Sequence, residues 1–265
     1  MHKNVNKPVF IFSLVTLILA AAGTALRSAE INAAFDFKTG LSTFSPLTVV
    51  MMLLSCIAVA FYIIFTRRID TSNIPGDYIS SFHTPLLPFI VSIIALFIML
   101  IGAYILLMLG LESISSAASG ILALLAALSG VAGFNLSLHA FRKKGQGDLM
   151  LSAVIDVIFL CFWTVLYYRQ EAANPVLIDS MYAFLGLCAS TLAFFYIAGF
   201  TAGRPSPRAS LLFSGIGIFF CVVALINAAN YAYGLFFIAL IIRLFTASLL
   251  LLSNKPVQQD EAQSE

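Results

Sequence analysis

The sequence predicts an all-α, polytopic membrane protein with about eight transmembrane helices and both termini in the cytoplasm. Of its 265 residues, 61% are hydrophobic and only 10% are charged, whereas soluble domains are about 45–50% apolar and about 25% charged. One globular core could not hide so much apolar surface from water. The apolar segments are about 20 residues long and apolar on all sides, which is typical of spanning helices, since barrel strands alternate in polarity.

Eight apolar segments are separated by polar or turn-forming residues, and each is long enough to cross the bilayer. In chain order they cover residues 8–26, 46–65, 86–109, 116–138, 149–167, 180–202, 210–229 and 234–252. Short connections predict antiparallel hairpins for the third and fourth segments and for the seventh and eighth. The segments form one transmembrane domain over residues 1–253, followed by a disordered, acidic cytoplasmic tail over residues 254–265.

The distribution of Lys and Arg predicts the orientation. Ten of these residues lie at one set of segment ends, whereas the opposite loops carry three, namely Arg27, Lys38 and Arg169. Cytoplasmic loops carry the excess of cations, so the basic side is expected to be cytoplasmic. The first segment resembles a secretory signal peptide, but its apolar core is longer than the usual 7–15 residues, and we expect it to be retained. Short loops and the lack of a soluble domain are compatible with the plasma membrane, which is the expected location.

Aromatic side chains at the predicted outer ends of the fifth and eighth segments are expected to form an interfacial belt. These are Trp163, Tyr167, Tyr168, Tyr231 and Tyr233.

Two predicted helices carry rows of small residues at alternating steps of three and four, a spacing that favours close helix crossings. In the fourth segment the row contains Ser116, Ser119, Ala123, Ala126, Gly130, Gly133, Ser137 and Ala140. In the seventh it contains Ser210, Ser214, Gly217, Cys221, Ala224 and Ala228. We infer that these two helices are central, and we predict that they touch each other.

A faint internal similarity links residues 60–66 with residues 194–201, because both contain Phe-Tyr-Ile before a cytoplasmic loop. It predicts a weak 4+4 parallel repeat, with halves over about 1–145 and 146–253.

Two charged residues lie within predicted spans, Asp156 in the fifth and Arg243 in the eighth. Counted from the cytoplasmic ends, Asp156 is seven residues deep and Arg243 nine, which is a difference of about 3 Å along the membrane normal. An ion pair is therefore geometrically allowed. Such a pair either fixes helix register or lines a polar cavity that binds an ion, a proton or an anionic solute.

Four uncharged or weakly basic residues complete the candidate intramembrane site, although interhelical hydrogen bonding is their commoner role. They are Asn135 and His139 in the fourth span and Asn227 and Asn230 near the outer end of the seventh.

No catalytic, cofactor or metal motif is present: the four cysteines all fall in apolar segments, and there is no H-E-x-x-H, G-x-S-x-G or Walker A sequence. We therefore expect no enzyme, no cofactor and no metal. The expected partner is the lipid bilayer, and a net charge of +2 carries no nucleic-acid signature.

Two functions remain. The first is a permease-like carrier of a small solute or ion, which the intramembrane charges favour. The alternative is a non-catalytic membrane subunit or scaffold that packs against another membrane protein or a second copy. The scarcity of proline in the middle of the spans favours this alternative, because carriers commonly have broken helices. The feature that discriminates between them is whether Asp156 and Arg243 face a solvated cavity or lie in a dry helix contact.

Overall fold

The computed structural model describes residues 6–34, 45–71, 74–110, 116–143, 149–171, 177–228 and 230–254, and all regular structure in these ranges is helical. The helices are α1 (Asn6–Ala34), α2 (Pro46–Arg68), α3 (Tyr78–Ser81), α4 (Leu86–Leu109), α5 (Ser116–Arg142), α6 (Leu149–Glu171), α7 (Leu177–Thr201), α8 (Pro207–Leu225) and α9 (Tyr231–Ser253).

Eight of these helices, all except the four-residue α3, are long and apolar enough to cross a membrane. Each coincides with one predicted segment, so the all-α fold with about eight spans is confirmed, and the chain is a multi-pass integral membrane protein. Two segments end clearly elsewhere than predicted: α8 ends at Leu225, whereas the prediction extended to residue 229, and α1 continues to Ala34, whereas the predicted segment ended at residue 26. The orientation relative to the cytoplasm, the plasma-membrane location and the 4+4 repeat stay predictions.

Local chemistry explains several helix ends. Before α2, the Ser45 side chain accepts a hydrogen bond from the Leu47 amide, and before α9 the Asn230 side chain accepts one from the Ala232 amide. Both residues are N-caps, which satisfy amides that have no partner within the helix. The α4 helix ends at Gly110, whose φ of 64° is a conformation that only glycine adopts readily.

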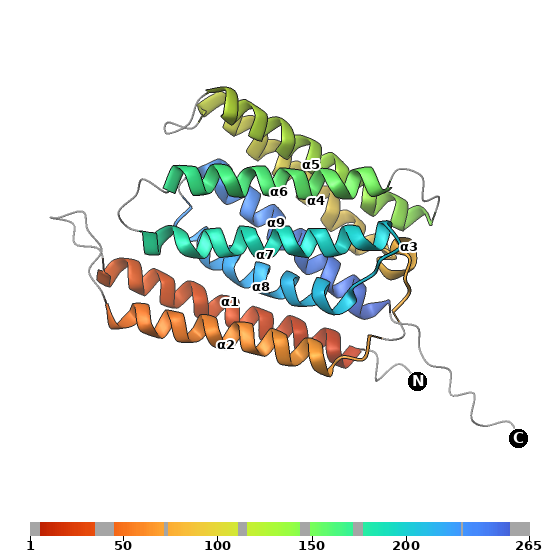
Figure 1. Cartoon of the computed structure of the whole chain (residues 1–265), viewed down its shortest axis with the longest axis horizontal. Helices are drawn as coiled ribbons and strands as arrows, with labels where there is room; N and C mark the ends of the chain where they lie inside the picture. Colours follow the sequence, from red (N-terminus) through yellow and green to blue (C-terminus); the bar gives the residue numbers. More distant parts are fainter. Residues whose placement is uncertain are drawn as a thin grey trace, which may run out of the picture.

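The packing order places six helices in a closed circuit. Each of α4, α5, α6, α7, α8 and α9 packs on the next, and α9 returns to α4. The α1 and α2 helices form a pair along α8, at the opposite edge of the bundle from α4 and α5 (Figure 1). The first turn of α1, the last turn of α9 and the short α3 lie at the same end of the bundle (Figure 1). We call this the basic end, because α2 ends there with Arg67 and Arg68, α5 ends there with Arg142, and Arg204 follows the end of α7.

The predicted contact between the two helices with small residues is wrong. The α5 helix packs on α4 and α6, whereas α8 packs on α7, α9, α1 and α2. Within their apolar windows, α8 is 61% buried and α5 39%, so α8 is central, as expected, but α5 is nearer the periphery. Each row of small residues serves a neighbour in the circuit: a Cβ on Gly130 would meet Met99 of α4, and one on Gly217 would meet Ser190 of α7.

The predicted packing positions on these two helices lie inside the bundle. Ser119, Ala123, Ala126 and Gly130 of α5 are buried, and Gly133 is half-buried. Ser214, Gly217, Cys221 and Ala224 of α8 are buried as well.

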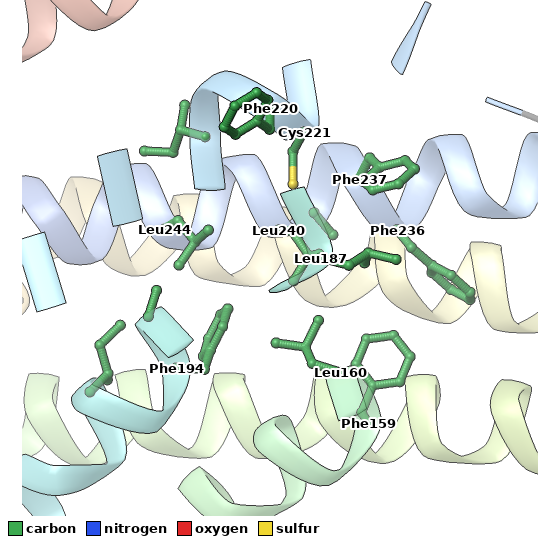
Figure 2. Close-up of a cluster of buried hydrophobic side chains, with 14 of the residues drawn as sticks. Phe159, Leu160, Leu187, Phe194, Phe220, Cys221, Phe236, Phe237, Leu240 and Leu244 are labelled. Carbon is green, nitrogen blue, oxygen red and sulfur yellow. The ribbon is translucent and has the colours of Figure 1, made fainter. Parts of the chain in front are cut away.

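The main hydrophobic core lies where α6, α7, α8 and α9 meet. Figure 2 shows Phe159 and Leu160 of α6 facing Leu187 and Phe194 of α7, with side chains of α8 and α9 around them, among them Phe220, Cys221, Phe236, Phe237, Leu240 and Leu244. The side chains of this cluster are buried against one another. Close van der Waals packing of this kind holds membrane helices together.

The expected aromatic belt is wrong for three of its five members. Trp163, Tyr167 and Tyr233 are buried, whereas Tyr168 and Tyr231 are exposed. The Trp163 ring packs on those of Phe236 and Phe237, and its indole nitrogen has no hydrogen-bond partner within the described part of the chain. The depth of a residue along its helix predicted the belt, but the side of the helix that it occupies decided its environment.

Candidate functional site

An ion pair crosses the bundle interior from α6 to α9. Nη2 of Arg243 pairs with Oδ2 of Asp156, and the two side chains are only 11% and 1% exposed. Ser129 of α5 connects to both residues: its hydroxyl donates to Asp156 Oδ1 at 2.6 Å and accepts from Arg243 Nη1 at 3.2 Å. We call these three residues the ion-pair cluster. Since a buried carboxylate or guanidinium without a partner is strongly unfavourable, the cluster ties α5, α6 and α9 together.

The guanidinium lies between a glycine and an aromatic ring. A Cβ built on Gly133 of α5 would be 2.3 Å from Arg243 Nη2 and 2.5 Å from its Cζ. Arg243 also contacts Phe194 of α7. The ring centroid of Phe194 is 4.7 Å from Cζ of Arg243, a distance typical of a cation–π contact. Gly133 is therefore required for space rather than for backbone freedom, and its lack of a side chain lets Arg243 approach α5.

The ion pair faces a cavity of about 70 Å³ that is lined by residues of α3, α4, α5, α6, α7 and α9. We call it the ion-pair cavity. Its polar lining includes Tyr78, Ser92, Ser137, Asp156, Arg243 and Thr246. The rest of the lining is mostly apolar, and a space of this size holds a few water molecules or a solute of a few heavy atoms. Asp156 and Arg243 thus border a cavity and are not enclosed by helix packing on every side.

The short helix α3 covers the basic end of the cavity. Tyr78 and Phe82, at its two ends, both line the cavity and are buried. Burial raises the pKa of Tyr78 well above its ordinary value; the charge of Asp156 raises this pKa further, and that of Arg243 lowers it. The Tyr78 hydroxyl therefore stays protonated at neutral pH and lies within electrostatic reach of the ion pair.

Hydrogen bonds hold the α3 segment in place. Asn254, the C-cap of α9, donates through Nδ2 to the carbonyl oxygens of Ser81 at 3.1 Å and His83 at 2.9 Å. His83 Nδ1 lies 3.3 Å from the carbonyl oxygen of Ala140 in α5. Asn254 was assigned to the disordered tail, but it is ordered; residues 255–265 of that tail lie outside the described residues.

The other predicted site residues do not line the ion-pair cavity. Asn135 donates to Ser152 Oγ at 2.9 Å and so connects α5 to α6. His139 is half-buried in the last turn of α5. Asn227 is exposed in the turn after α8, and Asn230 caps α9, so both lie at the opposite end of the bundle from α3. Of the six candidates, only Asp156 and Arg243 share the cavity.

A second buried charge pair was missed by the sequence analysis. Arg27 had been placed in a loop over residues 27–45, but α1 continues to Ala34, and Arg27 is 2% exposed. Its Nη1 donates to Glu30 Oε2 at 2.8 Å, and its Cζ lies 5.1 Å from the ring centroid of Tyr182 in α7. The i, i+3 spacing of Arg27 and Glu30 was the signal that could have extended the helix.

No group of three or more His, Cys, Asp or Glu side chains in the described ranges could hold a metal ion. Among the cysteines, Cys56 and Cys161 are exposed on the outer surface and Cys221 is buried.

No protein-family model, curated protein or solved structure matches this chain.

Proposed function

We propose that this protein is a permease-like carrier that moves a small polar solute across the membrane, with the ion-pair cavity as its binding site. The observation that carries the proposal is the position of Asp156 and Arg243 on the wall of a cavity, together with several hydroxyl groups. Ionisable residues within the membrane are rare, and those that face a cavity commonly mark a solute or ion pathway. A pair with a structural role alone would not need the space beside it.

The position of the cavity fits a carrier. Its lining includes Asp156 and Arg243 as well as Tyr78 and Phe82 at the ends of α3, and α3 lies at the basic end of the bundle (Figure 1). A carrier exposes its site to one side at a time, so one cover must move. The four-residue α3 segment is attached through a few hydrogen bonds to Asn254 and Ala140, and its displacement disturbs far less packing than the tilting of a complete span.

The competing function is a non-catalytic membrane subunit or scaffold. One observation favours it: each of the eight described spans is a continuous helix, without the mid-membrane break that many carriers have. Under this alternative the ion-pair cluster only fixes the register of α5, α6 and α9, and the cavity remains dry.

Cysteine labelling distinguishes the two functions. In a background with the four native cysteines replaced by alanine, Thr246→Cys places a thiol on the cavity wall, and Leu128→Cys places one on the exposed outer face of α5, next to Ser129. Thiols react as thiolates, which need water. For a carrier, a charged methanethiosulfonate reagent modifies the Thr246→Cys variant in proteoliposomes and leaves the Leu128→Cys variant unmodified. Equal inertness of the two thiols would refute the carrier proposal and favour the scaffold.

A further inference from the structure

The chemistry of the cavity wall indicates which solute it accepts. The Arg243 guanidinium has five N–H donors. Among the described residues, its hydrogen-bond partners are Asp156, through Nη2, and Ser129, through Nη1. Two of the five N–H groups are therefore used, and three remain for other acceptors. The Arg243 side chain lines the cavity and is 11% exposed.

A guanidinium with free donors is matched to a planar oxyanion. Its N–H groups form a flat fork that binds the two oxygens of one carboxylate or nitrate in parallel, whereas a spherical anion uses the fork poorly. Gly133 and Phe194 lie against the guanidinium and limit its rotation. The hydroxyls of Ser137 and Thr246 line the same cavity and can donate to further oxygens of a bound solute.

The charge of the site sets a second condition. Without ligand, Arg243 and Asp156 together carry no net charge. An anion alone would give the site a net negative charge within the membrane, which is strongly unfavourable. One proton on Asp156 restores neutrality, and the guanidinium contact that the carboxylate gives up becomes available to the ligand.

We propose that the ion-pair cavity binds a small planar monovalent oxyanion on Arg243 while Asp156 takes up one proton, and that the two cross the membrane together. This inference rests on the proposed carrier function. In the loading step an O–H bond forms between a proton from the aqueous phase and Asp156 Oδ2, while Arg243 Nη2 exchanges that oxygen for an oxygen of the ligand. No electrons are transferred. After the site opens to the other side of the membrane, Asp156 releases the proton into the aqueous phase on that side.

The groups that face Asp156 come from every element around the cavity. Arg243 of α9 and Tyr78 of α3 are the other titratable residues of the lining, while α4, α5 and α7 contribute only uncharged side chains, such as Ser92 and Ser129. Tyr78 stays protonated at neutral pH because burial and the Asp156 charge both raise its pKa. Asp156 is therefore the group in the cavity that can take up a proton.

Swelling of proteoliposomes in iso-osmotic ammonium salts tests the proposal. Ammonia crosses lipid unaided and consumes a proton inside, so an anion that enters with one proton produces electroneutral salt uptake and swelling, recorded by light scattering. We expect ammonium nitrate and ammonium glycolate, corrected for empty liposomes, to give swelling at least about tenfold faster than ammonium chloride, a ratio that corresponds to about 1.4 kcal/mol. Comparison of the first two salts shows whether the site prefers nitrate or a carboxylate.

The need for a protonophore separates coupled from uncoupled transport. An anion that crosses alone builds up charge, so swelling that requires a protonophore in the wild type would overturn the proposal. Equal swelling in chloride would also overturn it, as would no swelling in any salt. Labelling of the Thr246→Cys variant then shows whether the carrier function itself survives, since that readout does not depend on the choice of anion.

Two variants assign the roles of the pair. Proteoliposomes with the Asp156→Asn variant should swell in ammonium nitrate only when the protonophore is added, because the amide cannot take up the proton. Arg243→Lys keeps the charge but loses the planar fork, and its rate should fall at least about tenfold. Gly120→Ala is the matched control on α5, since an added Cβ there meets no atom within 4 Å. If the Asp156→Asn variant is not recovered as a folded protein, the swelling rates of the wild type in the three salts, with and without protonophore, still decide the proposal.

Discussion

The contact between Gly133 and the Arg243 guanidinium predicts the effect of a single added methyl group. In Gly133→Ala the new Cβ would lie 2.3 Å from Nη2, 2.5 Å from Cζ and 2.8 Å from Nε of Arg243. Real Cβ atoms do not approach other heavy atoms so closely, so the guanidinium must move. Because the Phe194 ring also lies against it, we expect the guanidinium to move away from Asp156 and Ser129.

The expected cost follows from what the guanidinium loses. Two hydrogen bonds connect it to the ion-pair cluster, one to Asp156 and one to Ser129. A hydrogen bond to a charged group contributes about 1.5–3 kcal/mol, and removal of one partner of a buried pair costs about 3–5 kcal/mol. Since Arg243 is retained and relaxes in part, we expect Gly133→Ala to lower the free energy of unfolding by about 2–4 kcal/mol.

The assay is equilibrium unfolding of the purified protein in mixed micelles with increasing sodium dodecyl sulfate, followed by circular dichroism. Gly120→Ala on the same helix controls for the general effect of a methyl group, because its Cβ meets open space. A second measurement repeats Gly133→Ala in the Asp156→Asn, Arg243→Gln double variant, where the ion pair no longer exists. There the added methyl should cost less than about 1 kcal/mol, because coupled residues are not additive.

Two results would refute this reasoning. A cost for Gly133→Ala no larger than that for Gly120→Ala would mean that the guanidinium moves without loss. An equal cost in the wild-type and double-variant backgrounds would mean that the methyl acts through helix packing alone, and not through the ion pair.

Three further predictions rest on other contacts. Asp156→Asn and Arg243→Gln should each destabilise the protein by about 3–5 kcal/mol and recover in part when combined; in the same unfolding assay, additive losses would count against a coupled pair. Asn254→Ala removes both hydrogen bonds to the α3 segment, so a cysteine on the cavity wall should be labelled several-fold faster, and an unchanged rate would show that Asn254 does not hold α3. Gly215→Ala would place a Cβ of α8 2.4 Å from the Tyr62 ring of α2, so it should loosen the packing of the α1–α2 pair on α8. We expect faster proteolysis after Arg68, and a cleavage rate equal to that of Gly120→Ala would contradict this prediction.

The number and limits of the spans could be predicted from composition because a bilayer imposes a simple requirement. Each span satisfies its own backbone hydrogen bonds and presents apolar side chains to lipid, so length and hydropathy suffice. The failures lie at polar ends. The sequence placed Arg27 in a loop because it is charged, but α1 continues beyond it and pairs it with Glu30. Helix ends in membrane proteins are also set by the polar partners available, and only the fold provides those.

The ion pair was within reach of sequence reasoning, whereas the cavity was not. The depths of Asp156 and Arg243 in their spans allowed a contact, since rise per residue is fixed. Ser129, Gly133 and Phe194, which complete the surroundings of the guanidinium, carry no mark in the sequence that links them to Arg243. Rotation of each helix about its axis determines whether such residues meet. No local pattern encodes that rotation completely.

By itself, the sequence determined that this chain lies in a membrane, how many times it crosses, and which two spans carry charge. These features follow from the transfer of side chains into hydrocarbon, which depends on residue type and on position along the chain. Only the tertiary structure decided that α5 packs on α4 and α6 and not on α8, that three of the five belt aromatics are buried, and that α3 covers a cavity beside Asp156 and Arg243. Those features depend on contacts between segments far apart in the chain, where many helix arrangements bury similar apolar area and the fit of individual side chains selects one.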